Sequence, residues 1–439
     1  MVHGSQTFAM DTHCYMKKRY VSLLESGKFS DCCFLVDDEK IQSHKIILAL
    51  SSPVFEAMLF GPLAAAEIVI DDCDASDFRQ MLAFIYTDDM QIYSVINAWQ
   101  LIYIAKKYMI DDLLDYCVQY IRKELEVANI LMNLEFADLF NVEGMRTLCM
   151  DALRMYAKVI LNWDYHMKPT TLCNLLDQNE CNASEEFLVC TALKWAYTEC
   201  QRNKLDATKH NVRAVLKKSG ALSRLRFLSI PPGDLVNNKL FTEILNDDEL
   251  AVLQSCQLSA SLEETSKLQC LNLCANANHR DTIPLREKLG YRRVLKSGNV
   301  FHANGHSKLT TQMAVNKCVL VNGFLLPTRR APETSLSSNY IENLNITVTD
   351  VFRKKVLEMS YVQTVTYGTL NTVKIAEPFL FEQGHKYDID ISWSTGYLQW
   401  ANEYSMHYLA PSVINKDVQF EFSDPFDCGF IQGVSYCPI

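Results

Sequence analysis

The hydrophobic pattern of this 439-residue chain changes its period once, near Thr282. Before that point apolar residues recur at helical spacing, as in Met132, Phe136 and Phe140. After it, apolar and polar residues alternate, as in 387–393 and 418–423, which is typical of strands with one buried side. The length also exceeds what one hydrophobic core usually holds. The sequence therefore predicts several domains, with an antiparallel β-sandwich at 283–439.

The part before Thr282 divides again into a mixed segment and a helical one. In the first 125 residues, 33–36 and 41–44 read as a hairpin, and Ser52 before Pro53 predicts a capped helix running to about Phe60. Residues 127–253 follow helical spacing throughout. Two prolines and a glycine at 231–233 cannot continue a helix, and they predict a junction between two helices.

Composition narrows the classes of protein that the chain can belong to. No run of 18 apolar residues occurs, and residues 1–12 lack an apolar signal segment, so we expect a cytoplasmic protein that neither spans a membrane nor is secreted. Its 16 cysteines are then read as reduced, buried thiols. The net charge is −10, whereas residues 285–439 hold 15 basic and 14 acidic side chains. The acidic first two thirds weigh against nucleic-acid binding.

Several segments of the first third follow one another in a recognisable order: Phe29-Ser30-Asp31, then 43–58 (SHKIILALSSPVFEAM), 84–88 (FIYTD) and 105–108 (AKKY). Together they resemble the BTB/POZ family over about residues 14–125. Farther on, 182–187 and 192–202 look like the BACK region of BTB proteins that carry a terminal PHR domain. The segments 315–317, 321–324 and 377–379 with Tyr387 are similar to that PHR domain, although Leu325-Leu326-Pro327 departs from its pattern.

The resemblance implies a multi-domain α+β architecture: an α/β BTB fold at 14–125, an all-helical BACK-type region at 126–281 and a PHR-like antiparallel β-sandwich at 283–439. It also implies a substrate adaptor of a cullin-3 RING ubiquitin ligase, in which a BTB homodimer holds cullin-3 and the sandwich presents an unidentified protein substrate. Such an adaptor has no catalytic residue, metal or cofactor. The alternative is a dimeric BTB scaffold or transcriptional co-regulator that does not engage cullin.

Candidate interface residues come from spacing and from the resemblance. An apolar stripe before Gly27 predicts a dimer helix, formed by Met16, Tyr20, Leu23 and Leu24. The resemblance adds a charged pair near the dimer seam, Asp31 and Lys45. It assigns cullin binding to Leu59, Leu63, Ala65, Tyr86 and Tyr108. Ala65 stands where cullin-binding relatives carry a glutamate, so we expect cullin binding that is real but weakened.

The aromatic segment 396–408 permits two interpretations. Tyr397, Trp400 and Tyr404 are candidates for a substrate-facing loop, because aromatic residues with a polar tip dominate interface hot spots. The alternation of Tyr404, Met406 and Tyr408 fits equally well a strand that packs one side into the sandwich.

Motifs for metal binding and catalysis are weak. Cys270 and Cys274 are separated from His302 and His306 by 27 residues, where a zinc finger has about 12, so ordinary core thiols and loop histidines are favoured. No P-loop, dinucleotide-binding or nucleophile-elbow pattern occurs. Lys106-Lys107 and Arg329-Arg330 are read as solvated charges rather than phosphate clamps. We therefore expect no enzyme activity and no metal.

The change of period near Thr282 predicts that residues 283–439 fold on their own. Their core is expected to contain Val319, Val321, Ile346, Val348, Ile389, Ile391 and Phe420. Circular dichroism of this fragment should then show β structure without appreciable helix. A helix-dominated spectrum would contradict the assignment.

Overall fold

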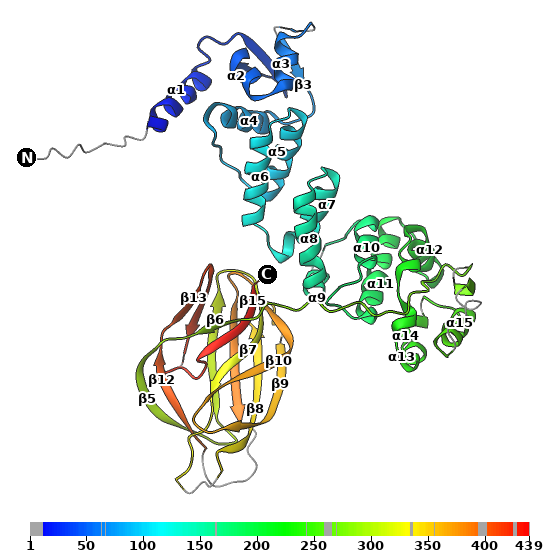
Figure 1. The fold of residues 1–439 in the computed structure, drawn as a ribbon, viewed down its shortest axis with the longest axis vertical. Helices are drawn as coiled ribbons and strands as arrows, with labels where there is room; N and C mark the ends of the chain where they lie inside the picture. Colours follow the sequence, from blue (N-terminus) through cyan, green and yellow to red (C-terminus); the bar gives the residue numbers. More distant parts are fainter. Residues whose placement is uncertain are drawn as a thin grey trace, which may run out of the picture. The chain divides into compact units, whose positions relative to one another are not determined.

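The structure, a computed structural model, describes residues 12–62, 64–65, 67–162, 165–242, 244–258, 266–268, 270–333, 337–354, 356–393, 402–424 and 428–438. The chain divides into two compact units (Figure 1). The N-terminal unit comprises Met1–Leu125 and Asn129–Asp151. The C-terminal unit comprises Glu126–Ala128 and Ala152–Ile439. Over the described ranges, no helix is long and apolar enough to cross a membrane.

The N-terminal unit mixes helices with one small sheet, ordered β2-β1-β3. Strand β1 pairs antiparallel with β2 and parallel with β3. Its elements are α1 (Thr12–Ser26), β1 (Cys32–Val36), β2 (Glu39–Ser43), α2 (Lys45–Ser51), α3 (Pro53–Phe60), β3 (Glu67–Ile70), α4 (Ala75–Thr87), α5 (Val95–Lys107), α6 (Asp111–Lys123), α7 (Ile130–Leu139) and α8 (Glu143–Met155), the last of which continues into the C-terminal unit.

The start of α3 confirms the helix expected after Ser52. The Ser52 hydroxyl accepts a hydrogen bond from the Phe55 backbone N–H at 3.1 Å, and Pro53 occupies the first helical position. The same hydroxyl donates to the Tyr108 carbonyl oxygen at 2.5 Å. One buried side chain therefore caps α3 and ties it to the end of α5.

Aromatic packing forms the centre of this unit. Phe34, Phe55, Phe78 and Tyr108 are each fully buried. The Phe55 and Tyr108 rings are stacked with centroids 4.4 Å apart, and Phe34 lies 5.7 Å from Phe55 and 5.1 Å from Phe78. Such ring pairs contribute about 0.5–1.5 kcal/mol each beyond the area they bury. The sheet, α3, α4 and the end of α5 thus share one core.

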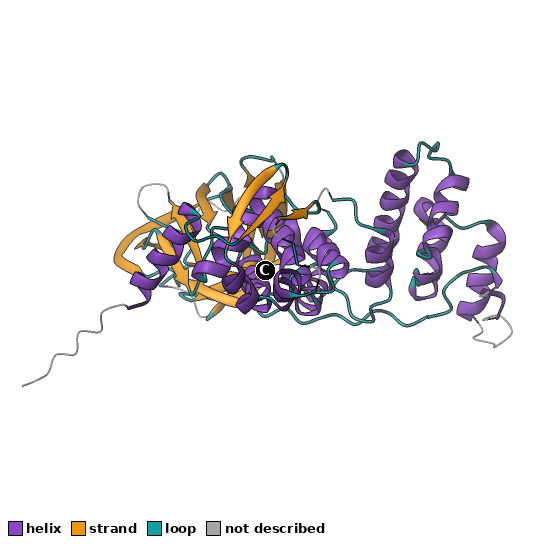
Figure 2. Ribbon diagram, turned by 90° about the horizontal axis from the view of Figure 1, so that it is seen from above, coloured by secondary structure: helices purple, strands orange, loops and turns teal. Residues whose placement is uncertain are grey.

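Between Ala152 and β4 (Lys288–Tyr291), the described residues form helices and no strand, and Figure 2 shows helices of this part packed together. The helices of the C-terminal unit are η1 (Val127–Asn129), α9 (Ala157–Ile160), α10 (Pro169–Leu176), α11 (Glu185–Arg202), α12 (Lys209–Ser219), η2 (Leu222–Arg224), η3 (Phe227–Ser229), α13 (Pro232–Asn237), α14 (Lys239–Thr242) and α15 (Asp247–Leu258). Helix α13 begins at Pro232, which confirms the expected helix junction at the two prolines.

The segment between the helices and the strands runs beside 178–182. The Cys181 backbone N–H donates to the Asp281 carbonyl oxygen, and the Asp281 N–H donates to the Asn179 carbonyl oxygen. Ile283 makes two hydrogen bonds with the Asn182 side-chain amide. Arg280 is only 7% exposed. Its guanidinium is paired with Glu185 and donates to the carbonyl oxygens of Leu176 and Gln178. The connection to residues 283–439, which the sequence predicts to fold on their own, is therefore held to residues 176–185 by buried hydrogen bonds.

The C-terminal β region contains antiparallel pairs only. One sheet has the order β10-β7-β15-β4, a second β13-β14-β6-β11-β8-β9, and β12 pairs with β5. The strands are β4 (Lys288–Tyr291), β5 (Val294–Ala303), β6 (Lys308–Val315), β7 (Val319–Pro327), β8 (Asn339–Asp350), β9 (Val356–Thr366), β10 (Leu370–Phe381), β11 (Lys386–Trp393), β12 (Asn402–Leu409), β13 (Ser412–Asn415), β14 (Val418–Ser423) and β15 (Gly433–Pro438). One apolar cluster includes residues of all three sheets, and it contains all seven predicted core residues.

Replacing Arg280 with alanine should destabilise the C-terminal unit, because Glu185 would remain buried without its cation. Removing one partner of a buried ion pair typically costs about 3–5 kcal/mol. Urea denaturation followed by far-ultraviolet circular dichroism measures this loss. Arg286→Ala, at an exposed site six residues along the chain, is the control and should change the unfolding midpoint little. Equal stability of the two variants would contradict the assignment.

Candidate functional site

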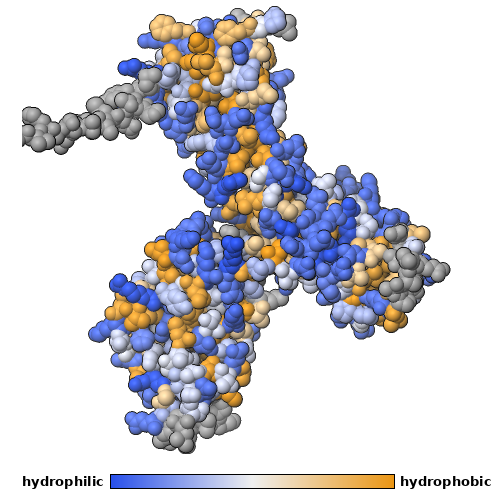
Figure 3. Space-filling model, in the orientation of Figure 1, coloured by the Kyte–Doolittle hydropathy of each residue, from blue (hydrophilic) through white to orange (hydrophobic). Residues whose placement is uncertain are grey.

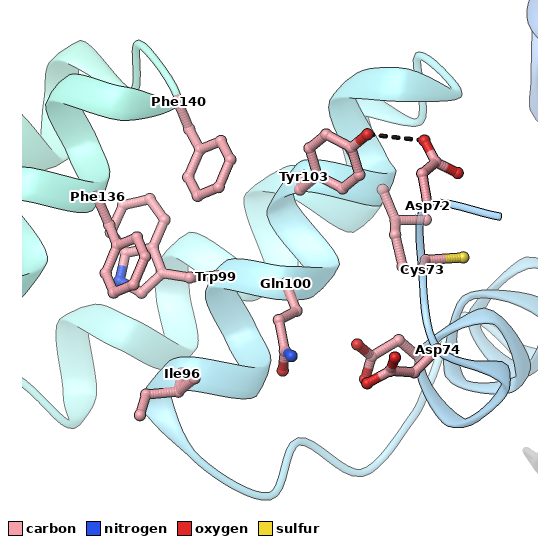
Figure 4. A pocket seen from close by; sticks show the side chains of 11 residues that line it. Asp72, Cys73, Asp74, Ile96, Trp99, Gln100, Tyr103, Phe136 and Phe140 are labelled. Atoms are coloured by element: carbon pink, nitrogen blue, oxygen red, sulfur yellow. Dashed lines mark hydrogen bonds between the residues drawn. The ribbon is translucent and has the colours of Figure 1, made fainter.

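The N-terminal unit contains a pocket of about 270 Å³, shown in Figure 4. Its walls come from the segment that leads into α4, from α5 and from α7. The lining residues are Asp72, Cys73, Asp74, Asp77, Ile96, Trp99, Gln100, Tyr103, Ile104, Phe136 and Phe140. Apolar and aromatic side chains therefore face a group of carboxylates across one cavity.

The aromatic wall is built by two helices that pack together. Trp99 of α5 stacks on Phe136 and Phe140 of α7, with centroids 5.7 and 6.0 Å apart. The Trp99 indole N–H donates to the Asn133 side-chain oxygen at 2.7 Å, and Asn133 donates to Asn129 at 2.9 Å. Because Trp99 is fully buried, this hydrogen bond fixes the orientation of its ring.

The carboxylates of the pocket have different surroundings. Asp72 accepts hydrogen bonds from the Lys107 ammonium at 2.5 Å and the Tyr103 hydroxyl at 2.7 Å, and these contacts, above all that of Lys107, lower the pKa of Asp72. Burial raises the pKa of Asp77, which accepts from the Asn97 amide at 2.9 Å. Asp74 is exposed and makes no capping hydrogen bond at the start of α4. Of these three carboxylates, Asp74 is therefore the one whose charge no described hydrogen bond offsets.

The pocket combines groups that can bind a partner side chain. Burial, reinforced by the charge of Asp72, raises the pKa of Cys73 to about 11, so little of this thiol is thiolate at neutral pH. An aromatic wall beside a free carboxylate favours an apolar or cationic side chain of a partner.

A second feature of the same unit is a set of exposed apolar side chains around α1 and α2. Phe29 is 87% exposed and is held at φ 63°, a left-handed backbone conformation that bulky residues rarely adopt. Tyr20, Ile46 and Leu50 are exposed as well, and Leu23 is half-buried. Figure 3 shows hydrophobic patches on this unit at the top of the view. Contiguous exposed apolar surface marks interaction sites.

The predicted cullin-binding residues do not form one exposed surface. Leu59, Tyr86 and Tyr108 are at most 4% exposed. Tyr108 stacks on Phe55, and the Tyr86 hydroxyl lies 2.8 Å from the His44 ring nitrogen, with burial raising the pKa of Tyr86 to about 12. These three side chains support the core and are inaccessible to a partner in this conformation. Ala65 is exposed, and Leu63 lies outside the described residues.

Two of the predicted dimer residues, Asp31 and Lys45, are in contact within one chain. The Asp31 carboxylate accepts a hydrogen bond from the Lys45 backbone N–H at 2.8 Å, at the first residue of α2. It therefore stabilises a helix N-terminus rather than forming an ion pair with the Lys45 side chain. The Met16 side chain lies outside the described residues.

Tyr404 and Met406 lie on the core face of β12, as the strand interpretation of segment 396–408 predicts. Tyr408 does not, because it is 36% exposed where the pairing with β5 shifts register. Tyr404 is fully buried, and its hydroxyl donates to Glu342 at 2.9 Å and accepts from the Trp393 indole N–H at 2.7 Å. Burial raises its pKa. Tyr404 is thus unavailable to a substrate. Tyr397 and Trp400 lie outside the described residues.

Among the described residues, one group of potential metal ligands converges: Asp350, Glu382 and His385, with ligand atoms within 4.8 Å of one another. Their contacts are structural. The Asp350 carboxylate accepts hydrogen bonds from two backbone N–H groups of the following turn, and its Oδ2 lies 3.0 Å from His385 Nδ1. The Glu382 carboxylate forms an ion pair with the Arg353 guanidinium at 2.6 Å. Cys270, Cys274, His302 and His306 form no such group in the described ranges.

Sequence reasoning missed the pocket. Phe136 and Phe140 were recognised only as helix periodicity, because spacing shows which residues share a helix side and not which helix faces them. The indole of Trp99 was the available signal, since a buried tryptophan needs a hydrogen-bond acceptor.

Comparisons with known proteins match a family profile within the N-terminal unit and relatives over about half of the chain. Residues 20–125 match the profile of the BTB/POZ domain family. BTB/POZ domain-containing protein 6-B of Danio rerio is 28% identical over 246 residues, covering 54% of this chain and 50% of that protein. BTB/POZ domain-containing protein 3 of Homo sapiens is 28% identical over 242 residues, covering 53% and 46%. The chain thus spans about half the length of the curated relatives it matches.

Two solved structures each match 27% of the chain. The BTB domain of zebrafish PATZ1 is 23% identical with a TM-score of 0.24, and it covers 27% of this chain and 99% of its own. The BTB domain of human Gigaxonin is 20% identical with a TM-score of 0.23, and it likewise covers 27% and 99%.

The pH dependence of alkylation at Cys73 tests whether this pocket thiol is buried as described. With a pKa near 11, Cys73 carries about a hundredfold less thiolate at neutral pH than an unperturbed cysteine. Its alkylation by iodoacetamide should therefore be slow near pH 7.5 and accelerate as the pH rises toward 11. Peptide mass spectrometry measures the rate, with the exposed Cys270 as internal reference. Equal labelling of both thiols at neutral pH would contradict the burial argument.

Proposed function

We propose that this chain, whose residues 20–125 are a BTB/POZ domain, is a non-catalytic substrate adaptor of a cullin-3 RING ubiquitin ligase. In this proposal a BTB homodimer binds cullin-3, the helices up to residue 281 are a BACK-type extension, and the PHR-like β region at 283–439 presents a protein substrate. Holding a ubiquitin-charged enzyme near a bound target raises its effective concentration, so the adaptor itself needs no reactive group.

The observation that carries the proposal is the apolar surface of the N-terminal unit. Phe29, Ile46, Leu50 and Phe60 are each at least 60% exposed although the core beneath them is filled by aromatic rings. Burial of such side chains supplies about 25 cal/mol per Å². A domain with this surface is stabilised by association, which supports a role in assembly.

The contact with cullin-3 is proposed to use the exposed loop before β3 together with the pocket. Ala65 is exposed there but offers no hydrogen bond. Glu67, the nearest carboxylate along the chain, is paired with Lys40 at 2.9 Å. A partner cation must compete with Lys40 for this carboxylate, which supports a weakened contact.

The alternative is a dimeric BTB scaffold or co-regulator that binds no cullin. The same apolar surface supports dimerisation in both proposals, so cullin binding is what separates them.

We expect the full chain to be a dimer through α1. An isologous interface of this type buries on the order of 1,600 Å². Leu23→Asp places a charge in it and should give the monomer mass by light scattering. Lys123→Asp, at the exposed end of α6, adds the same side chain elsewhere and should leave the dimer intact. A monomeric unmutated chain would refute this part of the proposal.

Ala65→Glu should strengthen cullin-3 binding and Leu63→Asp should abolish it. A restored charge-assisted hydrogen bond contributes about 1.5–3 kcal/mol, or roughly ten- to a hundredfold in affinity. Isothermal titration calorimetry with the cullin-3 N-terminal domain measures both changes. If the unmutated chain does not bind at high micromolar concentration and Ala65→Glu creates no binding, the scaffold alternative replaces the adaptor.

A further inference from the structure

The free edges of the C-terminal β region differ in how they are protected. Proteins usually blunt exposed strand edges with short strands, bulges, proline or lysine, because open backbone groups would otherwise pair with other chains. Strands β4 and β13 have four residues each. The pairing of β10 is interrupted between Lys374 and Phe379, beside Pro378. The pairing of β5 is irregular at two places, and β5 carries Lys296.

Strand β9 lacks all of these features. It pairs with β8 over 11 consecutive residues without a register shift, and it holds no lysine, arginine or proline from Val356 to Thr366. It ends the six-stranded sheet. Within the described part of the chain, its backbone groups from Val356 to Val365 bond to no strand but β8. Figure 1 shows β9 at the margin of the β region.

The side chains of β9 show which partner strand would fit. On the core side, Leu357 and Met359 pack against the hydrophobic cluster but are only partly covered. On the outer side, Val356 and Val362 are 49% and 58% exposed. An added strand with apolar residues at alternate positions would extend the core over Leu357 and Met359.

The charges on the outer side favour a basic residue in that strand. Glu358 is exposed and forms no ion pair among the described residues. Thr347 lies opposite it on β8, and Asp390, opposite Thr347 on β11, is already paired with Lys308 at 2.9 Å, so the unpaired carboxylate here is that of Glu358. Opposite charges facing each other across strands stabilise pairing.

We propose that β9 is a docking edge for an extended segment of a partner protein, with apolar residues toward Leu357 and Met359 and a lysine or arginine facing Glu358. A second copy of this chain fits less well, because β9 offers no cation to Glu358 in a full-length antiparallel pairing. Backbone hydrogen bonds would supply affinity, and the alternate side chains would supply selectivity. Naming the segment a substrate rests on the proposed adaptor function; the pairing itself does not.

The test uses the full chain and a labelled, acetylated peptide of about eight residues, alternating valine and serine with one central lysine. Fluorescence anisotropy gives its affinity. Two further peptides carry N-methyl groups on the odd or on the even amides. Because only alternate amides of an added strand face β9, one methylated peptide should lose binding and the other should retain it. Equal binding of both would overturn backbone pairing.

The charge is tested by exchange. Glu358→Lys should lower the affinity for the lysine peptide about tenfold and raise the affinity for a peptide with a central glutamate. Glu421→Lys on β14, a strand paired on both sides, is the matched control and should change neither affinity. Equal effects of the two variants would refute a local contact at β9. A change of mass by light scattering in Glu358→Lys alone would assign the edge to a second copy instead.

Cullin-3 binding by calorimetry should be unchanged in Glu358→Lys, since that contact is placed on the N-terminal unit. Peptide binding without cullin binding would leave the β9 site standing and the adaptor function refuted. Cullin binding without peptide binding would refute the β9 site and leave the adaptor function standing.

Discussion

Burial of Arg280 against Glu185 fixes the place where the chain passes from helices to strands. After α15 the chain runs back beside residues 176–185 before it enters the first strand of the β region. Arg280 fixes this segment, because it binds Glu185 and two carbonyl oxygens near the end of α10. The Asn182 amide then binds Ile283 on both its backbone groups. The same Asn182 amide donates to the Met155 carbonyl oxygen at 3.0 Å, and the next residue, Tyr156, donates to the Pro438 carbonyl oxygen at 2.8 Å.

A charged group was needed at this position because the returning segment has little apolar surface of its own. Residues 275–281 are mostly polar, so burial alone supplies little stabilisation. An arginine fork can satisfy several carbonyl oxygens and a carboxylate at once. The same device recurs in the β region, where the buried Arg292 binds Asp424 at 2.5 Å and the carbonyl oxygens of Ala410 and Ile431. In both places arginine orders an irregular segment.

Local and periodic features could be predicted from the sequence. The α3 cap at Ser52 and the helix start at Pro232 depend on a few neighbouring residues, and the core of the β region depends on alternation. Features that depend on tertiary contacts could not. The resemblance assigns Leu59, Tyr86 and Tyr108 to a binding surface, but a position in a motif does not show that a side chain is exposed, and all three are buried. The Asp31 carboxylate binds a backbone group, which sequence cannot distinguish from a side-chain partner.

We propose that this protein brings other proteins together through exposed apolar surface of its N-terminal unit. Sedimentation equilibrium of the full chain, alone and with the cullin-3 N-terminal domain, tests this most directly. We predict the mass of two chains alone and of two chains with two cullin domains in the mixture. A mixture that retains only the mass of the chain by itself, at concentrations where BTB adaptors are expected to bind, would contradict the adaptor account.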